Sequence, residues 1–213
     1  MAMQSDCSGS KVKRLDFSEN RKESVVVRWE DYEDEQSSLS LCLVGKLWTI
    51  RRFNSNAFMK TMEMIWNPKQ GLEAKEIGTN LFLFQFYHWK DMERVTEGEP
   101  WFFEKCVVVL NPVIKGIQPS TMAESMTHAP FWVRVYDPPF EGVKESRIRT
   151  LANSLGTYIK TDEECKVGWT RSIRFKALME LREAFPDEIT LERGDAKTIS
   201  LNVKYEKLPN ICY

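Results

Sequence analysis

The order of apolar segments over residues 38–115 constrains the fold of this chain more than any other feature of its sequence. Four runs have the length of strands, and two segments place apolar residues at helical spacing. Asn54 provides a cap before the first helical segment, and Pro68 stops it. We predict strands over residues 38–47, 71–77, 80–87 and 102–110, and helices over residues 54–66 and 89–97. This β-α-β-β-α-β order is that of the ferredoxin-like fold, in which both helices cover one face of an antiparallel sheet and the other face stays free to bind a ligand.

The rest of the chain is predicted to comprise a tail, a linker and a second subdomain. Residues 1–37 are polar, so we expect a disordered or loosely ordered tail, in which Ser24–Trp29 is compatible with an edge strand or a short helix. Residues 116–130 are rich in Pro, Ser, Thr and Met without a period, which predicts a linker. Residues 131–213 are predicted to form a smaller α+β subdomain. Its expected strands cover residues 131–136, 157–160, 169–181, 189–192 and 198–205, and its expected helix covers residues 144–155.

The composition indicates a globular protein inside the cell. Hydrophobic residues make up 42% of the chain, which is enough for a buried core. The 30 basic and 31 acidic residues leave a net charge of -1, which excludes a protein that binds nucleic acid by bulk charge alone. We find neither an apolar run long enough to cross a membrane nor a secretion signal, so we expect an intracellular protein without membrane contact. The cluster Lys11-Val-Lys-Arg14, either a weak nuclear signal or a solvated patch, slightly favours the nucleus over the cytoplasm.

The sequence has no pattern that predicts an active site or a metal site. None of the five cysteines forms a C-x-x-C pair, and neither His88 nor His128 has a partner at metal-binding spacing. Glycine-rich phosphate loops and nucleophile motifs are also absent. We therefore predict a protein that is not an enzyme and has no metal, no cofactor and no small-molecule substrate.

Cations and aromatic residues are interleaved in the loop that follows the first predicted strand. Lys46, Arg51 and Arg52 lie close in sequence to Trp48 and Phe53. Cations attract phosphate and aromatic rings stack on bases, so this pattern is typical of single-stranded nucleic-acid binding. The alternative is a solvated loop whose two aromatic rings cap the core.

A second basic pattern lies on the strand predicted over residues 169–181. Arg171 stands near its start, and Arg174 and Lys176 share one of its faces because side chains alternate with period two. These three residues form a second candidate basic surface, and an ordinary polar strand face is the alternative.

Several segments, taken in order, resemble a plant protein family. They are Leu43-Val-Gly-Lys46, Asn80-Leu-Phe-Leu-Phe-Gln-Phe86, Glu97-Gly-Glu-Pro-Trp-Phe-Phe103, Phe131-Trp-Val-Arg-Val135 and Lys204-Tyr-Glu-Lys-Leu-Pro-Asn-Ile-Cys212. Over residues 36–213 the chain resembles retroelement-derived, gag-like proteins, the first open reading frame of plant LINE-type elements. The resemblance implies an RNA recognition motif (RRM)-like domain of unknown function and nucleic-acid binding.

Members of this family carry a CCHC zinc knuckle after the second subdomain. The resemblance makes Cys212 the first zinc ligand of that knuckle, but the sequence continues only to Tyr213. A structural zinc ion needs four ligands, so we expect the zinc knuckle to be absent and no metal to bind.

The resemblance also bears on the faces of the third predicted strand. Alignment with the RRM pattern places Phe82, Phe84 and Phe86 on the inner, helix-facing side and Leu81 and Leu83 on the outer side. An RRM uses outward aromatic residues to stack bases. The outer face is therefore predicted to lack a stacking platform and to suit packing against the second subdomain or a partner protein.

Two functions are compatible with these observations. The first is non-enzymatic binding of single-stranded RNA or DNA, with modest and salt-sensitive affinity. The alternative is a protein-interaction or oligomerisation module that has lost nucleic-acid binding together with the zinc knuckle, for which a homo-oligomer is the simplest assembly.

Overall fold

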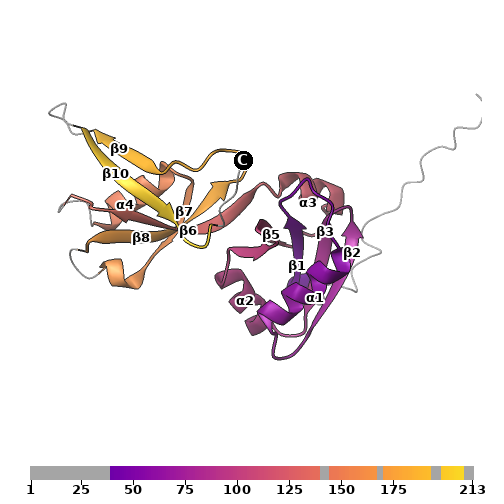
Figure 1. Cartoon of the computed structure of the whole chain (residues 1–213). Helices are drawn as coiled ribbons and strands as arrows, with labels where there is room; N and C mark the ends of the chain where they lie inside the picture. Colours follow the sequence, from indigo (N-terminus) through magenta and orange to yellow (C-terminus); the bar gives the residue numbers. More distant parts are fainter. Residues whose placement is uncertain (1–38, 140–143, 167–169, 193–197, 209–213) are drawn as a thin grey trace, which may run out of the picture. The chain divides into compact units, whose positions relative to one another are not determined.

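Two antiparallel sheets of five strands and four α-helices make up the described part of the chain (Figure 1). The computed structural model describes residues 39–139, 144–166, 170–192 and 198–208, and these described residues belong to one compact unit. The predicted α+β class is confirmed. The expected tail over residues 1–37, with Lys11–Arg14 and Ser24–Trp29, and the family position Cys212 lie outside the described residues.

The first sheet has the strand order of a ferredoxin-like fold. A short 3-10 helix, η2 (Leu39–Leu41), precedes it. Its elements are β1 (Cys42–Leu47), α1 (Ser55–Trp66), β2 (Leu72–Gly78), β3 (Leu81–Phe86), α2 (Trp89–Glu97), β4 (Trp101–Phe103) and β5 (Cys106–Pro112). The spatial order β2-β3-β1-β5-β4 contains the predicted four-stranded arrangement, extended by β4 at one edge.

The predicted cap and stop of the first helix are both present. The Asn54 side chain accepts a hydrogen bond from the backbone N–H of Ala57 at 3.0 Å, which begins α1. Asn67 ends the helix in the left-handed region with φ of 43°, and its N–H bonds to the carbonyl of Glu63.

The apolar run over residues 102–110 is a hairpin rather than the single strand that we predicted. Glu104 and Lys105 both have positive φ, 47° and 67°, and form a two-residue turn between β4 and β5. Phe103 consequently pairs with Cys106. The usual turn residues Asn and Gly are missing here, so the sequence did not indicate the turn.

The phenylalanine stripe of β3 lies on the inner face, as predicted. Phe82, Phe84 and Phe86 are buried in one cluster with the α1 residues Phe58 and Trp66. The ring centroids of Phe58 and Phe82 are 4.7 Å apart. Gly45 lies on the neighbouring strand β1, next to these rings. A Cβ atom added at Gly45 would lie 2.5 Å from the Phe84 ring. The close approach of β1 to the aromatic layer therefore requires glycine.

The outer face of the first sheet is covered by a short helix, α3 (Pro119–Ser125), which lies in the segment that we predicted to be a linker. Met122 and Met126 are buried in a cluster that includes Val44, Leu81 and Val109 from the outer face. The prediction that this face suits packing is thus confirmed for Leu81. Helix α3 is one of the elements that pack against the face.

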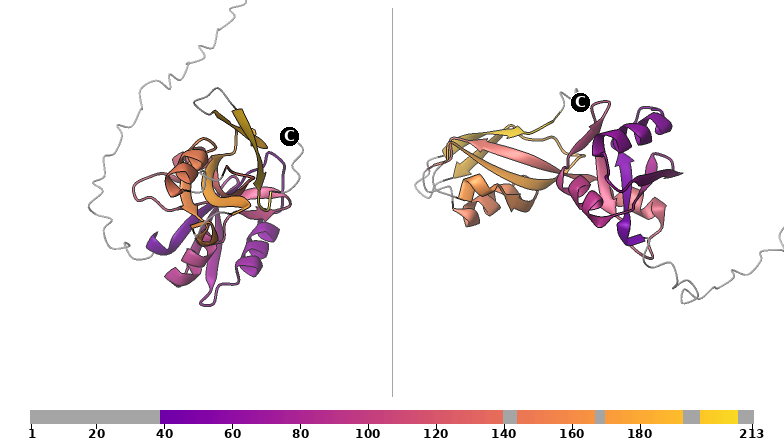
Figure 2. Two further views of the ribbon diagram at one scale, coloured as in Figure 1. Left: turned by 90° about the vertical axis from the view of Figure 1, so that its left-hand side faces the viewer. Right: turned by 90° about the horizontal axis from the view of Figure 1, so that it is seen from below.

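The second sheet is built from β6 (His128–Tyr136), β7 (Thr157–Thr161), β8 (Ser172–Glu180), β9 (Glu188–Glu192) and β10 (Thr198–Tyr205) in the order β7-β8-β6-β10-β9. The strands expected over residues 189–192 and 198–205 are present as β9 and β10, and they pair as an antiparallel hairpin. Helix α4 (Glu145–Asn153) lies along one face of this sheet, its inner face (Figure 2). Its residues Ile148, Leu151 and Ala152 are buried in the core on that side. A short 3-10 helix, η4 (Glu163–Lys166), follows β7.

Candidate nucleic-acid interface

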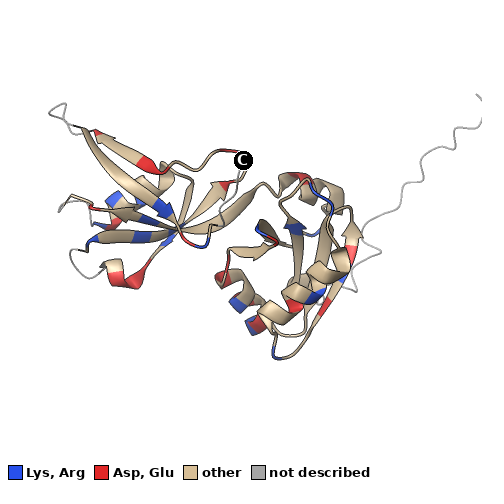
Figure 3. Ribbon diagram, in the orientation of Figure 1, with Lys and Arg blue, Asp and Glu red and all other residues tan. Residues whose placement is uncertain are grey.

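Side chains alternate between the two faces of the second sheet. Along β6, Phe131, Val133 and Val135 are buried on the inner face. The intervening residues of β6 and their cross-strand neighbours on β7, β8 and β10 form the outer face. We refer to its solvent-accessible cations and aromatic residues as the cation–aromatic face; they are Trp132, Arg134, Tyr136, Lys160, Arg174 and Lys204. Lys176 lies on the same side of the sheet, opposite Trp132, but is buried. Figure 3 shows basic residues on β8 and β10.

Two aromatic rings of this face are paired with cations. The Arg174 guanidinium lies 3.8 Å from the centroid of the Trp132 ring, and the Lys160 ammonium lies 5.9 Å from it. The Lys204 ammonium lies 5.6 Å from the centroid of Tyr136. Both rings are half-buried, so each keeps an accessible part. This arrangement places flat apolar surfaces beside positive charge, which is the chemistry that binds a base and its phosphate.

Arg174 is fixed by two carboxylates. Its Nε and Nη2 donate to the two oxygens of Glu206, each at 2.8 Å, and Nη1 donates to Asp162. Arg134 donates to Glu206 at 3.0 Å. The hydrogen bonds from Arg174 and Arg134 lower the pKa of Glu206 to about 2, and the hydrogen bond from Arg174 lowers the pKa of Asp162. The ion pairs with Glu206 and Asp162 therefore hold the Arg174 guanidinium over the Trp132 ring.

The same residues border a polar cavity of about 380 Å³. Its lining includes three arginines, Arg134, Arg174 and the exposed Arg171, and three acidic residues, Asp162, Glu164 and Glu206. The charges of the lining therefore balance, so this cavity adds no net positive charge to the face.

The predicted residue Lys176 lies in the interior. Its exposed fraction is 3%, and its ammonium donates to the backbone carbonyl of Glu97 at 3.0 Å. Burial lowers the pKa of Lys176. Arg174 and Lys176 share one face, as predicted, but Lys176 does not contribute to a solvent-accessible basic surface.

The predicted loop residues after β1 are divided between core and solvent. Lys46 donates to the backbone carbonyl of Ala123 in α3 at 2.7 Å, so it anchors that helix. Phe53 packs in the first core, with its centroid 5.8 Å from that of Phe58, which agrees with the alternative of a core cap. Arg51 and Arg52 are exposed, and their side chains form no ion pair or hydrogen bond with another described residue. Trp48 is half-buried and packs against the core that contains α3.

Sequence reasoning missed most of the cation–aromatic face. Of its six members, only Arg174 was among the predicted residues. The available signal was the alternation in Phe131-Trp-Val-Arg-Val-Tyr136, which puts one tryptophan, one arginine and one tyrosine on the same side of a strand.

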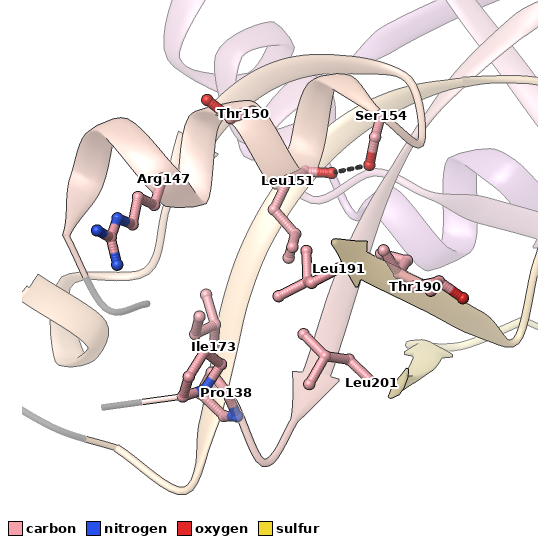
Figure 4. A pocket seen from close by; sticks show the side chains of 11 residues that line it. Pro138, Arg147, Thr150, Leu151, Ser154, Ile173, Thr190, Leu191 and Leu201 are labelled. Atoms are coloured by element: carbon pink, nitrogen blue, oxygen red, sulfur yellow. Dashed lines mark hydrogen bonds between the residues drawn. The ribbon is translucent and has the colours of Figure 1, made fainter. Parts of the chain in front are cut away.

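An apolar cavity of about 340 Å³ lies on the inner face of the same sheet (Figure 4). Leu151 of α4, Ile173 of β8, and Leu191 and Leu201 of the β9–β10 hairpin point toward one another around it. Helix α4 packs on β7 and β8. The inner face beside β9 therefore keeps an apolar hollow.

Among the described residues, no group of three or more His, Cys, Asp and Glu side chains is arranged to hold a metal ion. Within the described ranges, Cys106 and Cys165 form no disulfide. The helices in the described ranges are all too short or too polar to cross a membrane.

Residues 35–120 match the model of a family described as "Domain of unknown function (DUF4283)", a domain found in plant proteins. The match spans the first sheet with α1 and α2 and ends at the beginning of α3. The second sheet, which carries the cation–aromatic face, lies outside it. No curated protein matches the chain.

Proposed function

We propose that this protein binds single-stranded RNA or DNA through the cation–aromatic face of the second sheet and catalyses no reaction. The observation that carries the proposal is Trp132, whose half-buried ring has the Arg174 guanidinium at 3.8 Å and the Lys160 ammonium at 5.9 Å. Stacking on such a ring contributes about 1–3 kcal/mol per base, and this contribution tolerates different base sequences.

The corresponding face of the first sheet is covered by protein, which supports the choice of the second sheet as the binding surface. An RRM binds RNA on the face opposite its helices. In this chain α3 packs on that face, with Met122 and Met126 buried. The second sheet, by contrast, presents half-buried aromatic rings and exposed lysines on the face opposite α4.

We also infer that the chain derives from the gag-like protein of a plant retroelement. The match of residues 35–120 to a plant domain and the sequence resemblance over residues 36–213 support this origin. A gag-like protein acts inside the cell, and the Lys11–Arg14 cluster favours the nucleus.

The test is fluorescence anisotropy with labelled single-stranded RNA and DNA and with duplex controls, at two salt concentrations. Trp132→Ala is expected to weaken single-strand binding roughly tenfold, the loss of one base stack. Trp89→Ala is the matched control, because Trp89 is a 51% exposed tryptophan at the start of α2, outside the second sheet. Equal affinities of the two variants would contradict the assignment of the face.

The apolar cavity beside β9 favours a second candidate function, association with a second copy of this chain. Strand β9 is an edge strand that pairs only with β10 in the described structure, and edge strands pair readily with other chains. If the wild-type chain fails to bind single strands even at low salt, this second function becomes the better one.

A further inference from the structure

A separate cavity of about 220 Å³ lies at Trp48. Its lining includes two accessible aromatic residues, Trp48 and Phe185, and two cations, Lys105 and Arg182. We propose that this Trp48 cavity takes one nucleotide unit, with the base between the aromatic side chains and the phosphate at Lys105 and Arg182. The inference rests on the proposed function for its biological ligand, a single-stranded nucleic acid.

The accessible aromatic walls of the cavity are Trp48 and Phe185, and packing holds them in place. Phe131 is fully buried, so it offers no surface to a base, but it supports Phe185 edge-on with ring centroids 5.1 Å apart. Phe185 in turn contacts Tyr205, with ring centroids 5.0 Å apart. Trp48 has the Lys46 ammonium 5.7 Å from its ring centroid. Because these rings are already ordered, a base that enters them loses little affinity to reorganisation of the protein.

The charged groups of the lining are both cations. Lys105 occupies the turn between β4 and β5 with φ of 67°, and Arg182 is the second residue after β8. Both are exposed, and neither side chain forms an ion pair with a residue in the described ranges. The described lining includes no acidic residue that would repel an anion.

Size and chemistry together select a nucleotide. Cavities that enclose a whole drug-sized ligand measure about 300–1,000 Å³, so this smaller one fits a single ring system. Aromatic walls favour a flat ring, and two unpaired cations favour an attached anion. A base with its phosphate combines these two properties.

Trp48 is one of the residues predicted to bind nucleic acid in the loop after the first strand, but the side chains that surround it differ from those predicted. Phe53 lies in the first core and Lys46 anchors α3. The cations that line the cavity with Trp48 come instead from the β4–β5 turn and from the segment that follows β8.

Trp48 and Phe185 give a direct readout because both residues line the cavity and both are partly exposed. The experiment measures oxidation of these two rings by hydroxyl radicals in the full chain at a matched radical dose, with the modified peptides quantified by mass spectrometry. Adenosine 5′-monophosphate is the probe, and ribose 5-phosphate is the control that lacks the base. At about ten times its dissociation constant, the nucleotide should slow oxidation roughly tenfold, since the rate follows the fraction of empty cavity.

Two variants test the assignment of the cations and the stacking ring. Lys105→Ala/Arg182→Ala removes both phosphate contacts from exposed positions and should abolish protection by the nucleotide. Lys60→Ala/Lys69→Ala removes the same charge from exposed positions on α1 and in the loop that follows it, and should leave protection unchanged. Trp48→Ala should also lose protection, measured at Phe185, and the double alanine variant keeps the test valid if Trp48→Ala fails to fold.

The outcomes separate this proposal from the proposed function. Protection by adenosine 5′-monophosphate that depends on Lys105 and Arg182 supports the cavity, even if oligonucleotides do not bind the cation–aromatic face. Equal protection by ribose 5-phosphate, or no protection by a saturating oligonucleotide whose binding depends on Trp132, would overturn it.

Discussion

Glu99 is a buried carboxyl group whose titration is displaced by its surroundings. It is 5% exposed, and its Oε1 has no hydrogen-bond partner. Burial raises the pKa of Glu99 to about 8, while the charge of Lys176 opposes this shift. A pKa that is higher in the folded chain than in the unfolded one means that folding favours the protonated acid. The contribution of Glu99 to stability is therefore complete at low pH and is lost as the pH rises from its ordinary value of 4.5 through about 8.

Replacing Glu99 with Gln should remove this pH dependence. Glu99→Gln keeps a neutral side chain of the same shape, so its free energy of unfolding should match that of the wild type near about pH 5 and exceed it by a few kcal/mol near about pH 8. Urea unfolding at several pH values measures the difference. Glu104→Gln, at an exposed turn position, serves as the control and should follow the wild type. A Glu99→Gln curve parallel to the wild-type curve would disprove the displaced pKa.

At the scale of elements, α3 determines which surfaces are accessible. Its Met122 is buried against the outer face of the first sheet, and Lys46 donates to its Ala123 carbonyl. A helix of seven residues is not stable alone, so its packing must hold it in place.

Truncating the buried methionine should therefore be costly. Met122→Ala should lower the free energy of unfolding by about 2–5 kcal/mol, the usual cost of a large-to-small change in a core. Met64→Ala is the matched control, because Met64 is 78% exposed on α1 and its loss should change stability by less than about 0.5 kcal/mol. Urea unfolding compares the two, and similar small effects would show that α3 is not packed on the sheet.

Periodicity predicted the elements that are long enough to show a period. The helical spacing of Phe58, Met62 and Trp66 and the alternation of Phe82, Phe84 and Phe86 gave the right elements and the right inner face. Helix α3 was missed because its seven residues hold one buried methionine, with the second buried methionine just beyond its end. Two residues cannot establish a helical period.

The candidate site was less predictable because its contacts join distant parts of the sequence. Arg174 is fixed by Glu206, which lies 32 positions later, and Lys176 is buried next to the carbonyl of Glu97, 79 positions earlier. Alternation placed Arg174 and Lys176 on one face. It did not reveal that one remains at the surface while the other is enclosed.

At the scale of the whole molecule, the net charge of -1 means that nucleic-acid binding must depend on where the cations lie. In the cation–aromatic face, Arg134 and Arg174 are paired with carboxylates and Lys160 lies 3.8 Å from Glu97. Lys204 has a ring contact with Tyr136 and no ion pair with a described residue. Lys204 is therefore the cation of this face that is best placed to meet a phosphate.

Two charge reversals that change the net charge equally should then have different effects. Lys204→Glu should weaken single-strand binding roughly tenfold and lower the salt dependence of the affinity by about one phosphate contact. Lys75→Glu makes the same change on the exposed edge strand β2 of the first sheet and should bind almost as the wild type does. Anisotropy titrations across a salt series measure both quantities. If the two variants lose the same affinity and the same salt slope, binding follows the total charge of the molecule, and no particular face of the second sheet is responsible for it.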